Sequence, residues 1–440
     1  MRVFGKNAFA ARLPSALAGL ATVLLLVFYA RKRLGSESTG FLAALFLVSS
    51  RGFIEIHAAR SADFDAMLTL WITLYLIAFY EWLIHSSNVA LRIFAAALIA
   101  AILTKSIAGC LFLPALFIFT LATGNGKKLI GKNMLFAIAS VAGLISFYLI
   151  AREFYQPGYF DLFWKYDIID RFGKVQEGHS GPFTFYYDRA INWQWNPYIY
   201  MLIPAAICLL YKADKRYLRF TLFILLNLLL FLLTISFSAT KIDWYATPYF
   251  PIGSLILGMA ANRVLLLLWP FGKMEAGQAG YLKKRIATGF SFAVILVALY
   301  AVVSKNYKRI LQTADIIDDG DPRTRIAMYM NGFAEAHPGK NRLVVLYEDY
   351  NAPLQFYAEV LAEKRELLLF APKIDIHGIS KPVCLIGSTT GPGAYHSLQP
   401  GDIVILSEDK PADSVQAKWN TEITDHGDYN VRALLIKSKK

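Results

Sequence analysis

Charged and aromatic side chains gather in four short segments of this chain, each lying between strongly apolar stretches. In chain order the segments read "HAARSADFDAMLTLW" (57–71), "ILTKSIAG" (102–109), "DRFGKVQEGHSGPFTFYYDRAINWQW" (170–195) and "SFSATKIDWYATPYFP" (236–251). The side chains in them that could do chemistry are Arg60, Asp63, Asp65, Lys105, Arg171, His179, Lys241, Trp244 and Tyr245. The cations among them come from all four segments, and a ring of cations at a membrane edge suits a phosphate, because charge-assisted hydrogen bonds strengthen as water is excluded.

Several of these residues have two interpretations. Asp63 or Asp65 would cap the following helix, because a carboxylate there accepts hydrogen bonds from free N–H groups and meets the positive end of the helix dipole. Alternatively, one of them orients a substrate hydroxyl or acts as a weak general base. Lys105 either extends its ammonium to the lipid headgroups or binds an anion. Lys241 and Tyr245 are four residues apart, so a helical turn there would point both side chains the same way.

Two further residues, His179 and Trp244, are candidate substrate contacts because they lie in the same aromatic-rich segments. No close set of histidine, aspartate and glutamate has the spacing of metal ligands, so we predict no cofactor and leave only a divalent metal open. The three cysteines, Cys110, Cys208 and Cys384, are too scattered to indicate a disulfide framework.

The elements that must position these segments are membrane helices. The 440 residues are 56% hydrophobic and 18% charged, with a mean hydropathy of +0.42. Apolar stretches of about 15 to 20 residues recur, and charges fall between them because a charge at mid-bilayer costs about 2.5–3.5 kcal/mol. We predict about ten spans, near residues 13–29, 40–56, 66–83, 90–104, 107–122, 134–151, 198–211, 218–236, 247–268 and 286–303.

Basic residues are divided unevenly between the two sets of loops. The short loops of one set hold only Arg60, Lys105 and Lys241, whereas the other set holds Arg31, Lys32, Arg33, Arg92, Lys127, Lys128, Lys132, Lys212, Lys215, Arg216, Lys273, Lys283, Lys284 and Arg285. Because basic loops stay in the cytoplasm, the chain is expected to be a multi-pass protein of the bacterial inner (plasma) membrane with all four segments outside. This topology accounts for much of the net charge of +13, so no nucleic-acid partner is indicated.

The chain divides into a membrane domain over 1–304 and an outer domain over 305–440, expected in the periplasm. The membrane domain contains one long outer loop, 152–197, which is too long to be a mere connection. In the outer domain "RLVVLYE", "ELLLFA", "PVCLIG", "DIVILSE" and "RALLIKS" read as strands, with helices around 323–337 and 351–363. Strands alternating with helices predict a small α/β domain.

Together these segments resemble membrane glycosyltransferases of the aminoarabinose-transferase and dolichyl-phosphate-mannose protein mannosyltransferase type. The matching blocks occur in the same order over about residues 4 to 260, as "FGKNAFAARLPSALAGLATVLLLVFYARKRLG", "ARSADFDAMLTLW", "ILTKSIAG", "GHSGPFTFYYDRAINWQWNPYIYMLIPA" and "FSATKIDWYATPYFP". The resemblance implies a mostly α, polytopic helix bundle of the GT-C type, followed by an outer α/β domain.

The resemblance also implies roles for individual residues. Asp65 resembles the family's second outer-face aspartate, and Lys105 resembles its lysine near the fourth and fifth helices. Lys241 and Tyr245 resemble the lysine–tyrosine pair that faces the donor phosphate, and Arg171 a basic phosphate contact. The family's general base lies in an acidic loop upstream of the residue that corresponds to Met1. The sequence therefore predicts a truncated gene model, an internal start or a degenerate copy, and upstream DNA would distinguish these.

The predicted activity is transfer of a sugar from a polyprenyl-phosphate donor to a hydroxyl of a glycolipid such as lipid A, a glycan or a protein. Its partners would be that donor, that acceptor and the bilayer. Two alternatives stay open. One is a non-catalytic homologue that binds polyprenyl phosphate. The other is a transporter or flippase, although transporters tend to place ionisable groups near mid-membrane rather than at helix ends.

Overall fold

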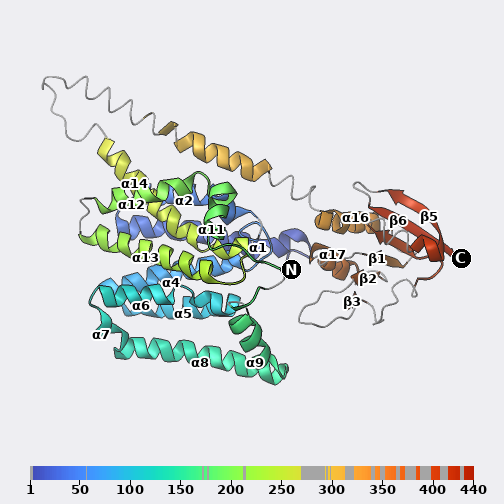
Figure 1. Ribbon diagram of the computed structural model, residues 1–440, viewed down its shortest axis with the longest axis horizontal. Helices are drawn as coiled ribbons and strands as arrows, with labels where there is room; N and C mark the ends of the chain where they lie inside the picture. Colours follow the sequence, from blue (N-terminus) through green and yellow to red (C-terminus); the bar gives the residue numbers. More distant parts are fainter. Residues whose placement is uncertain are drawn as a thin grey trace. The chain divides into compact units, whose positions relative to one another are not determined.

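The computed structural model describes residues 3–55, 57–170, 173–175, 178–211, 215–268, 293, 296–297, 299–312, 322–337, 342–346, 352–362, 367–371, 383–386, 398–406, 415–426 and 431–440. The chain divides into two compact units, Met1–Ile310 and Leu311–Lys440. The first unit is helical and the second combines helices with a sheet (Figure 1). Each unit is described by itself below.

The long helices of the first unit follow the apolar runs of the sequence. They are α1 (Ala8–Tyr29), α2 (Glu37–Val48), α4 (Asp65–His85), α5 (Asn88–Lys105), α6 (Leu113–Ala122), α8 (Lys132–Tyr155), α12 (Tyr198–Leu210), α13 (Lys215–Phe237) and α14 (Tyr249–Leu268). Shorter turns connect them: α3 (Arg51–Ile54), α7 (Gly126–Leu129), α9 (Tyr159–Leu162), α11 (Phe185–Arg189) and the 3₁₀ or π turns η1 (Ala30–Leu34), η2 (Ser106–Cys110), η3 (Phe163–Asp170), η4 (Ala190–Gln194) and η5 (Asp243–Ala246).

Local sequence fixes where several of these helices begin. Asn7, Ser36 and Ser87 precede α1, α2 and α5, and each side chain accepts a hydrogen bond from a backbone N–H of the first helical turn. These caps satisfy donors that have no partner within the helix. Each of these three helices therefore begins with one of its free N–H groups paired to a side chain.

Six helices are long and apolar enough to cross a membrane, namely Ala8–Leu34, Asp65–His85, Asn88–Cys110, Lys132–Tyr155, Tyr217–Phe237 and Tyr249–Leu267. Three shorter apolar helices, α2, α6 and α12, occupy three more of the predicted spans. The tenth, near 286–303, falls mostly outside the described residues. The mostly helical, multi-pass membrane architecture is confirmed, but the count of ten spans is not.

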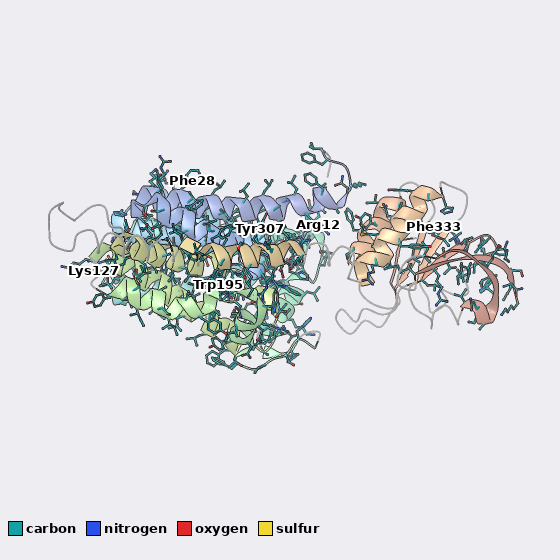
Figure 2. The ribbon with its side chains drawn as sticks, turned by 90° about the horizontal axis from the view of Figure 1, so that it is seen from above. Arg12, Phe28, Lys127, Trp195, Tyr307 and Phe333 are labelled. Carbon is teal, nitrogen blue, oxygen red and sulfur yellow. The ribbon has the colours of Figure 1, made fainter. Side chains whose placement is uncertain are left out.

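Phe28 and Lys127 show where two of the basic segments lie in the membrane unit. Arg12 and Phe28 lie toward opposite ends of α1, and Lys127 lies at the same end of the unit as Phe28 (Figure 2). The positions of Phe28 and Lys127 agree with the sequence-based assignment of residues 31–33 and 127–132 to one set of loops.

Glycine allows the closest contact between helices α2 and α14. A Cβ on Gly258 of α14 would lie 2.7 Å from the backbone nitrogen of Ala43 and 2.8 Å from the carbonyl oxygen of Thr39. Side-chain atoms do not fit at these distances, so glycine is required for the two backbones to meet. Such small-residue contacts are typical of helix packing in membranes.

Trp195 joins the end of the long loop to the bundle. Its side chain is fully buried, and its indole N–H donates to the hydroxyl of Ser50 at 2.7 Å. The indole covers Gly253 of α14, where a Cβ would lie 2.0 Å from the ring. The loop is therefore a packed part of the unit at this point.

The second unit is a six-stranded mixed sheet with two helices. Its elements are α16 (Pro322–Ala336), β1 (Leu343–Leu346), α17 (Ala352–Ala362), β2 (Leu367–Ala371), β3 (Val383–Ile386), β4 (Ile403–Leu406), β5 (Trp419–His426) and β6 (Arg432–Lys439). The strand order is β3-β2-β1-β4-β6-β5, with β1 parallel to β2 and β4 and the other pairs antiparallel.

Alternate residues of the central strands pack on opposite faces of this sheet, as strand geometry requires. Leu343 and Val345 of β1 pack with residues of α16 and α17, whereas Val344 packs with Val415 and Trp419 on the other face. The predicted α/β domain is confirmed, and all five predicted strands and both helices are present. Strand β5 was not predicted.

Candidate functional site

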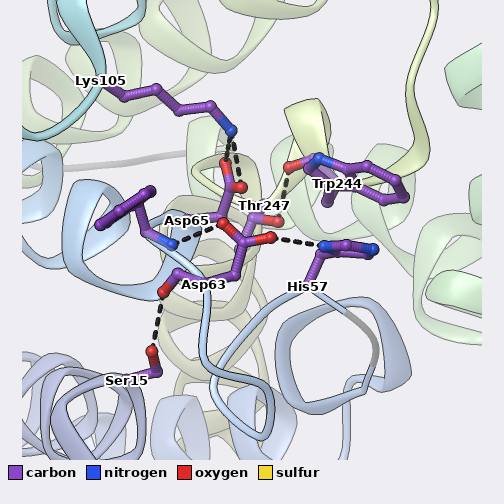
Figure 3. Close-up of polar contacts among 8 residues, drawn as sticks. Ser15, His57, Asp63, Asp65, Lys105, Trp244 and Thr247 are labelled. Carbon is purple, nitrogen blue, oxygen red and sulfur yellow. Dashed lines mark hydrogen bonds and ion pairs between the residues drawn. The ribbon is translucent and has the colours of Figure 1, made fainter. Parts of the chain in front are cut away.

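The candidate site begins with an ion pair between two helix ends. Asp65 is the first residue of α4 and Lys105 the last residue of α5. Because the two helices form an antiparallel pair, these ends meet, and the Lys105 ammonium lies 2.6 and 2.7 Å from the two carboxylate oxygens of Asp65 (Figure 3). Asp65 is 1% exposed and the Lys105 side chain 16%. Lys105 therefore extends to a carboxylate rather than to the lipid headgroups.

Neither aspartate is the N-cap of α4, although Asp65 stands in its first turn, where a carboxylate meets the positive end of the helix dipole. The residue before α4 is Phe64, and no side chain caps the helix. Asp65 binds Lys105 instead, and Asp63 accepts the N–H of Phe64, the residue next to it, at 2.6 Å. Both carboxylates thus lie at the N-terminal end of α4, where Asp65 also binds Lys105.

Tyr245 lies beside this ion pair at a pocket. The Lys105 ammonium is 5.2 Å from the centre of the Tyr245 ring, within range of a cation–π contact. The pocket is open on one side, and the space between its side chains, open solvent included, is about 520 Å³. Asp65, Lys105 and Tyr245 line it together with Leu68, Ile107, Ala108, Leu111, Phe231, Ile235, Ser238 and Pro248. It is therefore an apolar pocket with one ion pair in its wall.

Lys241 does not line the pocket, but it is hydrogen-bonded to Ser238, which does. Its side chain is buried, and its ammonium donates to the carbonyl of Ser236 at 2.9 Å and to that of Ser238, which lines the pocket. Burial lowers the pKa of Lys241. The expected helical turn joining Lys241 and Tyr245 is not formed, because the 3₁₀ turn η5 begins only at Asp243. Tyr245 lines the pocket itself, whereas Lys241 bonds backbone carbonyls beside it.

The long outer loop is tied to the same seam of residues 238–243. The backbone N–H of Lys241 donates to the carbonyl of His179 at 3.0 Å, and the Thr240 hydroxyl donates to the carbonyl of Lys174 at 2.8 Å. Arg189 forms an ion pair of 2.8 Å with Asp243. Burial raises the pKa of Asp243 while Arg189 opposes that rise. His179 thus contacts the seam through its backbone, and Arg171 lies outside the described residues.

A histidine that sequence reasoning did not select lies next to the ion pair. His57 Nδ1 is hydrogen-bonded to Asp63, and the imidazole stacks on Trp244 with ring centres 3.6 Å apart and planes 25° apart (Figure 3). Burial raises the pKa of Asp63, but the hydrogen bonds from His57 and Phe64 and the charge of Lys105 outweigh this and leave it lowered. The available signal was a histidine six residues before an aspartate in an outer segment.

Arg60 is half-buried, and its Nη1 is buried without a hydrogen-bond partner. It is not among the residues that line the pocket. The structure therefore brings Lys105 and Tyr245 into one site with Asp65, Lys241 to its edge, and Asp63 and Trp244 beside it. Among the described residues, no group of three or more His, Cys, Asp or Glu side chains could hold a metal ion.

A bundle of apolar helices with a charged site at helix ends beside an apolar pocket, carrying an extra α/β unit, is the architecture of a multi-pass membrane protein. Known structures share this fold. The crystal structure of ArnT from Cupriavidus metallidurans bound to undecaprenyl phosphate superposes with a TM-score of 0.68 at 17% identity, covering 98% of this chain and 85% of that one. The apo structure of the same protein gives a TM-score of 0.65.

Sequence comparisons give the particular relatives. The family model for dolichyl-phosphate-mannose-protein mannosyltransferase matches residues 1–150. Undecaprenyl phosphate-alpha-4-amino-4-deoxy-L-arabinose arabinosyl transferase 2 of Proteus mirabilis is 28% identical over 271 residues, which are 60% of this chain and 47% of that protein. An uncharacterized protein of Aquifex aeolicus is 28% identical over 283 residues, covering 61% and 54%. The chain spans about half the length of these curated relatives, and the resemblance drawn from its sequence is confirmed.

Proposed function

We propose that this protein transfers a sugar from a polyprenyl-phosphate donor to a hydroxyl acceptor at the outer face of the bacterial inner membrane. The observation that carries the proposal is the cation of Lys105 at the wall of an apolar pocket, beside Tyr245. A polyprenyl phosphate has the matching chemistry, because it joins a long apolar chain to an anionic head. The relative from Proteus mirabilis is named for a donor of this class.

The main catalytic demand is stabilisation of the leaving group. When the bond between the sugar's anomeric carbon and the phosphate oxygen breaks, the electron pair stays on the phosphate, whose negative charge grows. A fixed cation and a hydroxyl donor aimed at that oxygen lower the barrier because they need no rearrangement during reaction. Lys105 is fixed by Asp65, and Tyr245 is the neighbouring hydroxyl donor. Lys241, Arg60 and Arg171 are proposed to add positive charge around the phosphate.

Asp65 has a supporting part in this proposal. Both of its carboxylate oxygens accept hydrogen bonds from Lys105, which suits it to holding the lysine in place. The acceptor is a glycolipid, a glycan or a protein that presents a hydroxyl, and the α/β unit is proposed to lie in the periplasm. His179 and Trp244 are proposed as substrate contacts because both lie in the aromatic-rich outer segments.

The decisive experiment measures binding and transfer separately. The protein, as its native gene encodes it, is reconstituted in liposomes with undecaprenyl-phosphate-linked aminoarabinose or mannose and with lipid A as the first acceptor. We expect sugar transfer, and Lys105→Met should weaken undecaprenyl phosphate binding and slow transfer. The matched control is Lys128→Met, because the Lys128 ammonium is also held by a hydrogen bond, to the carbonyl of Leu83 at 2.6 Å, but at the opposite end of α4.

Two outcomes would support other functions. Binding of undecaprenyl phosphate without transfer from any donor and acceptor tested would support a non-catalytic lipid-binding protein. Movement of the lipid between leaflets without transfer would support a flippase. Equal transfer by Lys105→Met and the native protein would contradict the role given to the ion pair.

A further inference from the structure

We propose that a basic pocket at the end of the membrane unit away from Lys105 binds the headgroup of an anionic phospholipid of the surrounding bilayer. The charged or titratable side chains that line this basic pocket are Arg33, Glu81, His85, Lys215 and Arg219. The space between its side chains, open solvent included, is about 910 Å³. None of its described lining residues also lines the Lys105 pocket, so the inference goes beyond the proposed glycosyl transfer and does not depend on it.

Three helix ends form the basic pocket. Tyr29 is the last residue of α1, His85 the last residue of α4 and Lys215 the first residue of α13. Asp65, which lines the Lys105 pocket, is the first of the 21 residues of α4, so about 30 Å of helix separates the two pockets. Because membrane helices end at the level of the lipid headgroups, the basic pocket faces the phosphates of one leaflet. The charge of the neighbouring loops predicts that this leaflet is the cytoplasmic one.

Cations exceed carboxylates in the basic pocket. Arg33, Lys215 and Arg219 carry permanent charges, and Glu81 is the one acidic residue among the described residues that line it. Glu81 is already engaged, because its side chain is 8% exposed, accepts the Tyr29 hydroxyl at 3.1 Å and lies 3.0 Å from Nε of Arg33. Neither Lys215 nor Arg219 forms an ion pair with a residue that the structure describes. Within the described part of the chain, two positive charges of the pocket are therefore not balanced by a carboxylate.

Lys215 and Arg219 stand where positive charge is unfavourable. They are four residues apart on α13, so they lie on one face of the helix, where like charges repel. They also occupy its first two turns, beside the positive end of the helix dipole, and no acidic residue stands in the first turn. A phosphate between them removes both costs, because it accepts charge-assisted hydrogen bonds from the two side chains and offsets the charge at the helix end.

An apolar surface adjoins these cations. The ring centres of Tyr29 and Tyr80 lie 5.5 Å and 4.9 Å from that of Phe220, and all three residues line the basic pocket with Leu34 and Ile84. Side chains of this kind pack against acyl chains, and tyrosine is enriched at the level of the headgroups. Basic pockets between membrane helices on the cytoplasmic side bind anionic lipid headgroups. The pocket therefore matches a phospholipid, whereas inorganic phosphate would use its cations alone.

The test measures lipid binding to the full-length protein, as its native gene encodes it, after delipidation in an uncharged detergent. The probes are phosphatidylglycerol, which is anionic, phosphatidylcholine, which carries no net charge, and inorganic phosphate. Native mass spectrometry gives the affinity, and the melting temperature reports the stabilisation that a ligand of the folded state produces. We expect phosphatidylglycerol to bind and to raise the melting temperature, and the other two probes to give smaller shifts.

Removing the two cations should weaken this binding. From the contribution of basic side chains at an anionic lipid surface, Lys215→Gln combined with Arg219→Gln should bind phosphatidylglycerol about 30-fold more weakly. Without lipid, the same double variant should melt at the native temperature or above it, because the repulsion between like charges is gone. A variant that is no less stable alone but gains less from the lipid distinguishes a binding site from a structural role.

The matched control is Lys127→Gln combined with Lys132→Gln. Both lysines are exposed, and neither lines the basic pocket. Because both belong to the same set of basic loops, the control removes the same charge from the same side of the protein, and it should keep the native shift with phosphatidylglycerol. Lys105→Met should keep this shift too, because Lys105 lines the other pocket.

Three results would overturn the inference. The first is an equal affinity of the native protein and the Lys215–Arg219 double variant for phosphatidylglycerol. The second is equal stabilisation by phosphatidylglycerol and inorganic phosphate, which would indicate an anion site that needs no lipid. The third is equal stabilisation by phosphatidylcholine, which would indicate a lipid site without preference for charge. Because these measurements do not involve sugar transfer, a protein that binds phosphatidylglycerol but transfers no sugar would contradict the proposed function alone.

Discussion

Replacing both members of the Asp65–Lys105 pair separates their structural role from their role in binding phosphate. In Lys105→Met the carboxylate of Asp65, 1% exposed, loses its only cation within hydrogen-bond distance among the described residues. Removing one partner of a buried ion pair costs about 3–5 kcal/mol, because an uncompensated charge remains. The 16% exposure of Lys105 places the expected loss at the lower end, about 3 kcal/mol. Lys105→Met combined with Asp65→Asn leaves no buried charge, so it should recover most of this stability.

Phosphate binding should respond differently to the same substitutions. A hydrogen bond to a charged group contributes about 1.5–3 kcal/mol, which corresponds to about a tenfold to a hundredfold weaker Kd. Lys105→Met and the double variant both lack the cation, so both should show this loss. Recovery of stability without recovery of affinity is therefore the expected signature.

The measurements are unfolding in mixed micelles titrated with dodecyl sulfate and binding of undecaprenyl phosphate to the protein in detergent. The reasoning is refuted in one of two ways. If the double variant binds the lipid as tightly as the native protein, Lys105 makes no phosphate contact. If Lys105→Met is as stable as the double variant, the ion pair does not stabilise the fold.

Three further substitutions test other contacts. Gly253→Ala should destabilise the membrane unit by about 1–3 kcal/mol by overpacking against Trp195, because the added Cβ would lie 2.0 Å from the ring; a melting temperature checks it against Gly143→Ala, where nothing lies within 4 Å. Tyr245→Phe keeps the aromatic ring beside Lys105, whereas Tyr245→Leu removes it. The leucine variant should therefore bind the lipid more weakly than the phenylalanine variant, by about 0.5–2 kcal/mol. Equal affinities of the two variants would contradict the cation–π contact. Because the pKa of Asp63 is lowered in the fold, its stabilising contribution is present above the ordinary aspartate pKa of about 3.9 and is lost as pH falls through the lower folded value. Melting temperatures between about pH 5 and pH 3 should therefore fall more steeply for the native protein than for Asp63→Asn, and parallel curves would refute this.

Much of the fold was predictable because one strong physical signal determines it. Apolar runs of membrane length identify helices without knowledge of their neighbours, and nine of the predicted runs coincide with helices α1, α2, α4, α5, α6, α8, α12, α13 and α14. The Asp65–Lys105 contact was not predicted, although the sequence places both residues at the outer ends of two successive membrane helices. Strand β5, "WNTEITDH", was missed because its mostly polar residues lack the apolar alternation of a half-buried strand.

The finer geometry of the site depends on backbone conformations that residue types do not reveal. His57 reaches Trp244 only because a residue that is not glycine adopts a left-handed conformation. Lys241 turns back to the carbonyls of Ser236 and Ser238 because the seam is not helical at that point. Spacing of four residues gave the wrong relation between Lys241 and Tyr245 for the same reason. Contacts of this kind can be predicted only when the path of the backbone is known.

The junction between the long loop and the seam has a consequence for how this region can diverge. Two of the bonds use main-chain oxygens of the loop, those of Lys174 and His179, whereas Arg189 binds Asp243 through its side chain. Every amino acid carries such an oxygen, so the attachment does not depend on which side chains stand at 174 and 179. The side chains at those two positions can therefore change while these two bonds to the seam are kept.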